Sequence, residues 1–226
     1  PYLPFRYDMK TLRNKKNNKA LLLERFNLEP GDGPLFSAVT RITWQKGMDM
    51  LAEVADEIFY RGGRLIVHGQ GDHDIEDALR ATAERFPGRM AVSIGYSEPT
   101  AHLIHGGSDA IIQPSRFEPC GLTQLYALRY GCVPVVSRTG GLSETIIDAN
   151  DAAISARAAT GFQFHPVRAE GLRHALRRAV EAYGDKRQWA RLQLQAMRAD
   201  YSWDRSAESY AEVYGRLTNE QALMRH

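Results

Sequence analysis

Cysteine is scarce in this chain of 226 residues. Only Cys120 and Cys132 occur, they form no C-x-x-C pair, and the histidines form no cluster at metal-ligand spacing. A metal site is therefore not expected, and we expect reduced thiols and a cytoplasmic location. The sequence also lacks an apolar run of about 18 residues, a signal peptide and a lipidation motif, so no membrane partner is expected.

An excess of charge of one sign is also missing. The 29 Lys and Arg residues nearly balance the 27 Asp and Glu residues, and the net charge of +2 is too mild to indicate nucleic acid as a partner. The densest basic run is expected to be the solvated face of a helix; it comprises Lys10, Arg13, Lys15, Lys16 and Lys19. The hydrophobic content of 43% is ordinary for a globular domain.

Short apolar strands alternate with helical segments along most of the chain. The predicted strands are Leu35–Thr40, Arg64–His68, Met90–Ile94, Ala110–Gln113, Val133–Ser137 and Gly161–Phe164. The helices predicted between them are Met48–Tyr60, Ile75–Phe86, Thr100–Gly106, Leu122–Tyr130 and Leu142–Ala149. This alternation predicts the α/β class, with a Rossmann-like parallel sheet covered by helices on both faces.

Beyond the last predicted strand only helices follow, at Ala169–Tyr183, Lys186–Arg198 and Trp203–Leu217. We therefore divide the chain into a leading segment or linker (1–34), one Rossmann-like domain (35–218) and a tail (219–226). Because the chain starts with Pro1 and not Met, we expect it to be cut from a longer protein.

Residues 114–145 are the most informative stretch. The strand–loop–helix pattern brings Glu118 and the turn Thr139-Gly140-Gly141 to the C-terminal edge of the sheet, where ligands bind in open α/β folds. Bare backbone N–H groups of the glycine turn, at the start of a helix, suit a phosphate. Because a carboxylate repels phosphate, Glu118 is more suited to accept hydrogen bonds from sugar hydroxyls. Together they predict a nucleotide-sugar site.

Two cations and an aromatic residue follow other strand ends. Arg41 and Lys46 flank the turn after the first strand and can converge on one diphosphate, although each also suits an ordinary surface position. Tyr96 follows the third strand and can stack on a purine or simply cover the core. The segment Gly69-Gln70-Gly71-Asp72 lacks the third glycine of a dinucleotide fingerprint; we interpret it as a tight turn beside the nucleotide, with Asp72 a candidate N-cap.

The chain resembles bacterial glycogen synthases and plant starch synthases, which are retaining glycosyltransferases with two Rossmann-like domains, the GT-B architecture. The resemblance covers about residues 36–218 and rests on the order of several motifs: VTRITWQKGMDML, LIVHGQGD, IGYSE, PSRFEPCGLTQLYALRYGCVPVVSRTGGLSETI, ATGFQF and YSWDRSAESYAEVY. It covers only the C-terminal domain of such an enzyme.

The resemblance assigns roles to the candidate residues. Arg41 and Lys46 match the family's phosphate-binding cations, and Glu118 matches the first of two glutamates found in related transferases. Position 126 is Tyr126 where the second glutamate would stand, as in glycogen synthases. The remaining expected contacts with the nucleotide-sugar come from Tyr96 on adenine, backbone N–H groups near Cys120 and Gly121, and the turn Thr139, Gly140, Gly141 and Leu142.

The implied reaction moves glucose from ADP-glucose to the 4-hydroxyl at the non-reducing end of an α-1,4-glucan, with retention and without a metal or cofactor. The family's N-terminal domain, with its Lys-Thr-Gly-Gly-Leu motif and a histidine near the reaction centre, has no counterpart in this sequence. We therefore expect the isolated chain to transfer no glucose. Two alternatives stay open: a transferase that uses a UDP-sugar, and a non-catalytic nucleotide- or glucan-binding module.

Overall fold

The computed structural model describes residues 2–223. Its centre is a parallel sheet of six strands in the order β3-β2-β1-β4-β5-β6. The strands are β1 (Leu35–Val39), β2 (Arg64–Gly69), β3 (Met90–Ile94), β4 (Ala110–Gln113), β5 (Val133–Ser137) and β6 (Phe162–Phe164). Each predicted strand is present within about one residue, and the α/β Rossmann-like class is confirmed.

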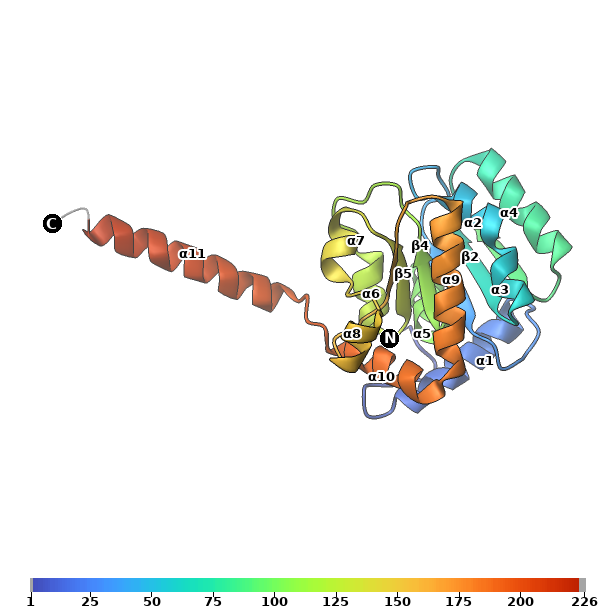
Figure 1. The fold of residues 1–226 in the computed structure, drawn as a ribbon, viewed down its shortest axis with the longest axis horizontal. Coiled ribbons are helices and arrows are strands. Elements are labelled where there is room, and N and C mark those ends of the chain that lie inside the picture. Colours follow the sequence, from blue (N-terminus) through green and yellow to red (C-terminus); the bar gives the residue numbers. More distant parts are fainter. Residues whose placement is uncertain (1, 224–226) are drawn as a thin grey trace.

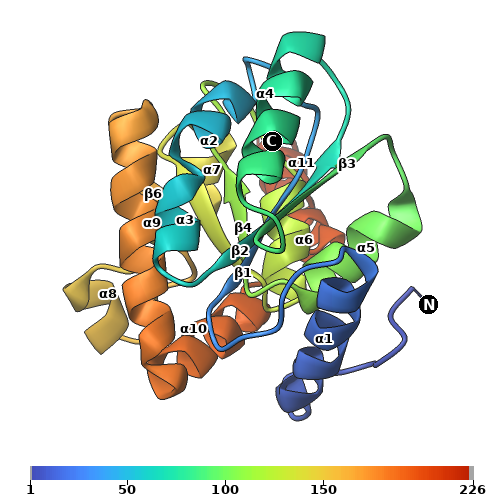
Figure 2. The same cartoon turned by 90° about the vertical axis from the view of Figure 1, so that its right-hand side faces the viewer.

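Helices cover both faces of the sheet (Figures 1 and 2). One face carries α2 (Met48–Val54), α3 (Asp56–Tyr60), α4 (His73–Arg85) and α9 (Ala169–Gly184), and its core includes Leu51, Leu65, Val67 and Leu176. The other face carries α1 (Lys15–Arg25), α5 (Glu98–Gly107) and α6 (Thr123–Arg129). The central strands are apolar nearly throughout because both of their faces are buried, as parallel sheets require.

The strand register determines where the loops of the candidate site lie. Leu35 pairs with Arg64 and Val39 with His68, so β1 and β2 end side by side. Gln113 of β4 pairs with Val136 of β5 in the same way. All loops that follow these strands therefore leave from one edge, where the candidate residues stand.

Two predicted helices are not continuous over their predicted ranges in the structure. The helix predicted over 48–60 is divided at Ala55, where the N–H of Ile58 bonds to the Ala55 carbonyl in a tighter turn. The helix predicted over 142–149 runs instead as α7 (Gly140–Thr145), and α8 (Asp151–Ser155) follows separately. It ends early because Ile146 is extended and Asp148 pairs with Gly161 beside β6.

The leading segment is more tightly bound than its polar sequence indicates. A short 3-10 helix (Leu12–Asn14) leads into α1, which packs Leu22 and Leu23 against α5. The expectation of a solvated basic face is wrong for Lys15, which is buried and donates to the carbonyl oxygens of His105 at 2.9 Å and Gly106 at 3.0 Å. The negative end of the α5 dipole accounts for this position.

Lys19 is the second exception in the basic run. Its ammonium group lies 2.7 Å from the Asp109 carboxylate and 3.0 Å from the Tyr183 hydroxyl. Burial lowers the pKa of Lys19, but the charges of Asp109 and Tyr183 and the hydrogen bonds to them together outweigh burial, so the net pKa is raised. Lys10, Arg13 and Lys16 are exposed, as expected.

The C-terminal part consists of α10 (Lys186–Arg198) against the domain and α11 (Trp203–Leu223) projecting away from it (Figure 1). The tail predicted at 219–226 is helical up to Leu223, and its last three residues lie outside the described residues. The apolar stripe of α11 is exposed, including Tyr210, Val213, Tyr214 and Leu217. In the described residues no helix is both long and apolar enough to span a membrane.

Candidate functional site

A cavity of about 650 Å³ lies at the C-terminal edge of the sheet, over the ends of β1, β2 and β3. Arg41, Lys46 and Tyr96 all line it, although they come from different loops. Gly69 and Gln70 line it too, as expected for a turn beside a nucleotide. The exposed fraction of Tyr96 is 82%, so this ring is not covering the core and is free to contact a ligand.

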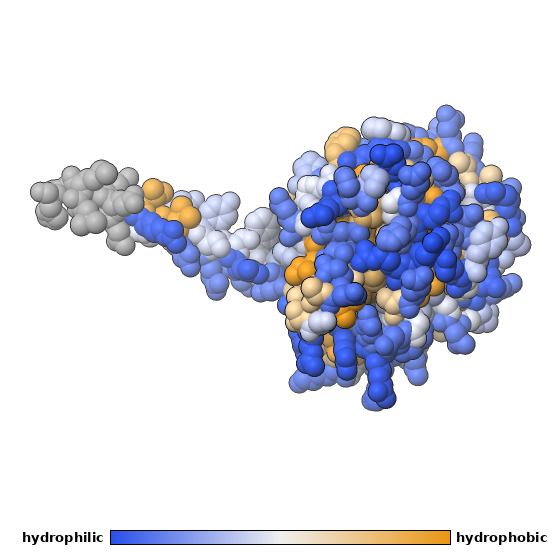
Figure 3. All heavy atoms as spheres, viewed as in Figure 1, coloured by the Kyte–Doolittle hydropathy of each residue, from blue (hydrophilic) through white to orange (hydrophobic). Residues whose placement is uncertain are grey.

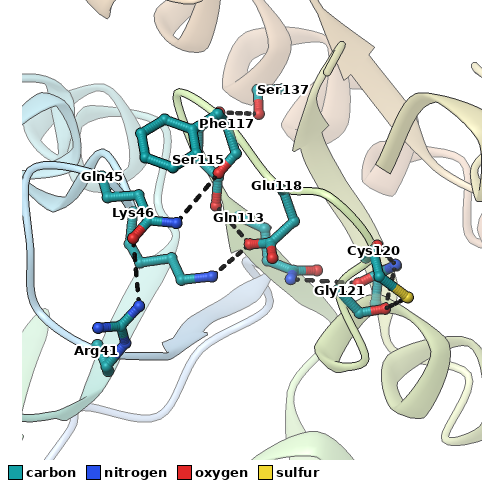
Figure 4. Close-up of polar contacts among 11 residues, drawn as sticks. Arg41, Gln45, Lys46, Gln113, Ser115, Phe117, Glu118, Cys120, Gly121 and Ser137 are labelled. Atoms are coloured by element: carbon teal, nitrogen blue, oxygen red, sulfur yellow. Dashed lines mark hydrogen bonds and ion pairs between the residues drawn. The ribbon is translucent and has the colours of Figure 1, made fainter. Parts of the chain in front are cut away.

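Lys46 connects this cavity to the candidate acid. Its ammonium group forms an ion pair with the Glu118 carboxylate, across the gap between the β1–α2 and β4–α6 loops (Figure 4). Glu118 is 8% exposed, and its carboxylate also accepts from the Ser115 hydroxyl at 3.2 Å. The acid is thus held in a fixed position.

Arg41 is the more accessible of the two cations. Its guanidinium is exposed and donates to the Gln45 side chain at 3.3 Å (Figure 4). In the described part of the chain Arg41 forms no ion pair. Its full charge therefore faces the cavity.

The glycine turn is packed directly against the Glu118 loop. A side chain at Gly140 would place its Cβ less than 3.0 Å from the Glu118 carbonyl oxygen, and one at Gly141 would meet the Cys120 carbonyl oxygen within the same limit. Gly140 also has a φ of +40°, which favours glycine. Glycine is required here because two backbones touch.

This packing corrects the expectation that the backbone N–H groups of the glycine turn are bare. The N–H of Gly141 is not bare, because it donates to the Glu118 carbonyl oxygen at 3.0 Å, and the N–H of Leu142 donates to Thr139 at 3.1 Å. Of the described residues that form the turn, only Gly140 keeps an N–H group without a hydrogen bond. The role of this turn in holding a phosphate stays a prediction.

Cys120 and Gly121 lie in the same loop, beside the turn. Gly121 has a φ of +78°, and its carbonyl accepts from the Gln124 side chain at 2.8 Å. The Cys120 thiol is exposed. The role of backbone N–H groups near Cys120 and Gly121 in binding the nucleotide-sugar likewise stays a prediction.

Sequence reasoning missed a clamp beneath the site. Arg116 donates two hydrogen bonds of 2.7 Å to the Asp49 carboxylate, and its guanidinium lies 4.4 Å from the centre of the Trp44 ring. Burial raises the pKa of Asp49, but the hydrogen bond and charge of Arg116 outweigh it, so the net pKa is lowered. This clamp between Arg116 and Asp49 holds the Lys46 loop against the Glu118 loop. The only sequence signal that could have indicated the clamp is the position of Arg116 next to Glu118 in the chain.

Sequence reasoning also missed the α5 and α6 wall of the cavity. His68, His102, His105 and Tyr126 line it, and their side chains come from β2, α5 and α6. Burial lowers the pKa of His105 to about 3, and Lys15 adds to the effect, so the imidazole is neutral.

The candidate N-cap Asp72 precedes α4 but does not cap the helix through its side chain. Its carboxylate instead accepts from the backbone N–H of Trp44 at 3.3 Å. No group of three metal-ligating side chains was found in the described residues.

Comparisons with known proteins agree with this picture. The model of the family "Glycosyl transferases group 1" matches residues 22–192. Glycogen synthase 1 of Rhizobium meliloti (strain 1021) is 56% identical over 217 residues, which are 96% of this chain and 45% of the relative. Glycogen synthase 2 of Agrobacterium fabrum (strain C58) is 56% identical over 96% of this chain and 43% of its own length. The chain thus spans less than half of these curated relatives.

A solved structure is also similar. The catalytic domain of starch synthase IV from Arabidopsis thaliana, bound to ADP and acarbose, superposes with a TM-score of 0.87 at 32% identity, over 96% of this chain and 45% of that one. Sucrose-phosphate synthase from Thermosynechococcus elongatus, with a TM-score of 0.66 at 22% identity over 90% of this chain and 49% of its own, shares the fold. The expected resemblance to glycogen and starch synthases, as one half of a GT-B fold, is confirmed, and the chain belongs to the group 1 glycosyl transferase family.

Proposed function

We propose that this chain is the donor-binding half of a cytoplasmic glycogen synthase that transfers glucose from ADP-glucose to the non-reducing end of an α-1,4-glucan, with retention of configuration. A further, N-terminal domain of the same enzyme is the partner that completes the site. The lengths of the curated relatives, of which the chain spans about 45%, support such a partner.

The order of the strands carries the proposal. Along the sheet edge, Tyr96 follows β3, Arg41 and Lys46 follow β1, Glu118 follows β4 and Gly140 follows β5. A nucleoside diphosphate sugar has the same sequence of groups: a flat base, two phosphates and a sugar rich in hydroxyls. Stacking, countercharge and hydrogen-bond acceptance are each available in the matching place.

The chemistry follows from the charges. Cleavage of the glycosyl–phosphate bond leaves negative charge on the departing diphosphate, and Arg41 and Lys46 stabilise that charge without a metal or cofactor. The carboxylate of Glu118 accepts hydrogen bonds from the glucose hydroxyls. With no separate nucleophile assigned, the acceptor hydroxyl attacks from the side of the leaving group and passes its proton to the leaving phosphate. The protein then acts by positioning and electrostatics.

ADP as the donor nucleotide is supported by the ADP-bound starch synthase that resembles this chain. Calorimetry with ADP and UDP on the 226-residue chain tests the donor. Tighter binding of ADP supports the proposal; tighter binding of UDP would favour a UDP-sugar transferase.

The activity is tested separately. We expect the purified chain to elongate no glucan from ADP-glucose, whereas the full-length enzyme does so and loses the activity when Lys46 or Glu118 is replaced by alanine. An unchanged rate in those variants would favour a non-catalytic binding module instead.

A further inference from the structure

A second cavity of about 650 Å³ shares no lining residue with the candidate nucleotide site. It lies between the α8 region, the end of α9 and one side of α10, and it reaches Phe162, where β6 begins. It is therefore near the opposite edge of the sheet from Arg41 and Glu118. Figure 3 shows apolar surface next to the base of α11, on the side of the domain where Figure 1 places α8 and α10.

Arginine side chains line this cavity from two sides. Arg187, Arg191 and Arg198 follow one another along α10, and Arg157 faces them from the segment after α8. All four are exposed, and in the described part of the chain no side chain forms an ion pair or hydrogen bond with any of their guanidinium groups. They form a concentrated positive charge whose guanidinium groups have no ion-pair partner among the described residues.

A single carboxylate lines the cavity, that of Asp185. It is already occupied, since it caps α10 by accepting from the backbone N–H groups of Arg187 at 2.9 Å and Gln188 at 3.0 Å. Its single negative charge offsets only part of the positive charge of the four guanidinium groups.

This charge pattern is unfavourable for the helix that carries it. Lys186 and Arg187 lie in the first turn of α10, where the helix dipole favours negative charge. Arg187 and Arg191 are like charges at i and i+4, which repel on a helix surface. A bound anion would relieve both effects.

The floor of the cavity is apolar. It consists mainly of aliphatic and aromatic side chains: Ala149, Ala153, Ile154, Phe162 and Leu192. Trp189 also lines it, is 3% exposed, and its indole N–H has no hydrogen-bond acceptor within the described residues. The volume is in the range of small-molecule sites.

We propose that this α8–α10 cavity is a binding site for a small phosphate monoester with a flat, apolar body. A dianionic phosphate meets the forked guanidinium groups of α10 and Arg157, since such groups bind phosphate oxygens in pairs. The apolar body covers Ile154 and Phe162. The site is independent of the donor site at the other edge.

The test uses the tryptophans as separate reporters, with AMP as the probe. In the ¹⁵N-labelled chain, the indole N–H of Trp189 reports on the α8–α10 cavity, whereas that of Trp44 lies beside Lys46. We expect AMP to shift the Trp189 resonance saturably, at constant ionic strength, and adenosine to shift it at least tenfold more weakly. The double variant Arg187→Gln/Arg191→Gln, and separately Arg157→Gln, should weaken the AMP effect at least tenfold, while Lys46→Ala should leave it unchanged.

Several outcomes would count against the site. A Trp189 resonance that does not move at millimolar AMP, that responds equally to potassium chloride or adenosine, or that responds equally in the arginine variants overturns the proposal. A shift of Trp44 alone overturns it while leaving the donor site standing. A shift of Trp189 alone supports it and counts against the donor site.

Discussion

The backbone N–H of Gly141 donates a hydrogen bond of 3.0 Å to the carbonyl oxygen of Glu118. The hydrogen bond joins the loop after β4 to the turn after β5, and it fixes the candidate acid from its backbone side. Lys46 fixes the same residue from its carboxylate side. Glu118 is therefore held by two segments that are distant from it in the chain.

Replacement of Gly141 by alanine should separate these loops. The new Cβ would lie less than 3.0 Å from the Cys120 carbonyl oxygen, so the backbone must shift. We expect a loss of stability of about 1–3 kcal/mol in denaturant unfolding, as for other overpacked sites. Gly184→Ala is the matched control, because no atom lies within 4 Å of its Cβ position. Equal stability of the two variants would contradict the contact.

Loss of either partner of the Lys46–Glu118 pair should abolish most transfer in the full-length enzyme. We expect Lys46→Ala and Glu118→Gln each to lower kcat by at least about 100-fold, the scale of one lost electrostatic contact to developing charge. Lys10→Ala and Glu181→Gln change the same charges on exposed surface and should leave the rate unchanged. A rate within about threefold of wild type in Glu118→Gln would count against its role.

Tyr96→Ala should weaken ADP binding without unfolding the domain, because the ring is 82% exposed. A lost base-stacking contact costs about 1–3 kcal/mol, which is roughly a 5- to 150-fold rise in Kd. Calorimetry with the chain measures it. Tyr60→Ala, which removes another ring that is 77% exposed, serves as control. Equal effects of the two replacements would rule out a specific stack.

Lys15→Ala should destabilise the domain although Lys15 belongs to a basic surface run. The replacement leaves the buried carbonyl oxygen of His105 without its donor and that of Gly106 with only the Tyr7 hydroxyl, at a cost of about 3 kcal/mol. Its neighbour Lys16 is exposed, and Lys16→Ala should be neutral within about 0.5 kcal/mol. Urea unfolding of both variants decides the matter; similar midpoints would mean that the buried lysine contributes nothing.

The buried imidazole of His105 should make the domain less stable as the pH decreases. Its folded pKa is lowered to about 3, mainly by burial, whereas an unfolded histidine titrates near 6.5. Between these values the unfolded chain binds a proton that the folded chain does not, so stability from this group is complete above about pH 6.5 and falls as the pH decreases, by up to about 1.4 kcal/mol per pH unit. His105→Gln should flatten the slope of unfolding free energy between about pH 6 and pH 4.

The control for this measurement is His174→Gln on the exposed side of α9, which should keep the wild-type slope. An unchanged slope in His105→Gln would show that the imidazole is not held neutral in the fold.

Much of the fold could be predicted because strands such as Val133–Ser137 are continuous apolar runs between turns. The gathering of Arg41, Lys46 and Glu118 could also be predicted, because parallel strands bring their following loops to one edge. Their roles in binding or catalysis are not tested by the structure and stay predictions.

What could not be predicted depends on contacts between distant segments. The burial of Lys15 follows from two helix ends that meet only in three dimensions, and nothing in a polar stretch signals them. The early end of α7 follows from pairing of Asp148 with Gly161. The occupied N–H of Gly141 follows from a loop that a linear motif does not show.

The docking of α1 against α5 bears on where this domain can be excised. Leu22 is fully buried and Leu23 is 8% exposed, both in contact with residues beyond the first strand. A truncated version that starts at the first strand would lack these leucines, expose Leu103 and Ile104 of α5, and leave Asp109 without Lys19. The unit that folds therefore begins upstream of the sheet, and a cleavage site between α1 and β1 would cut through it.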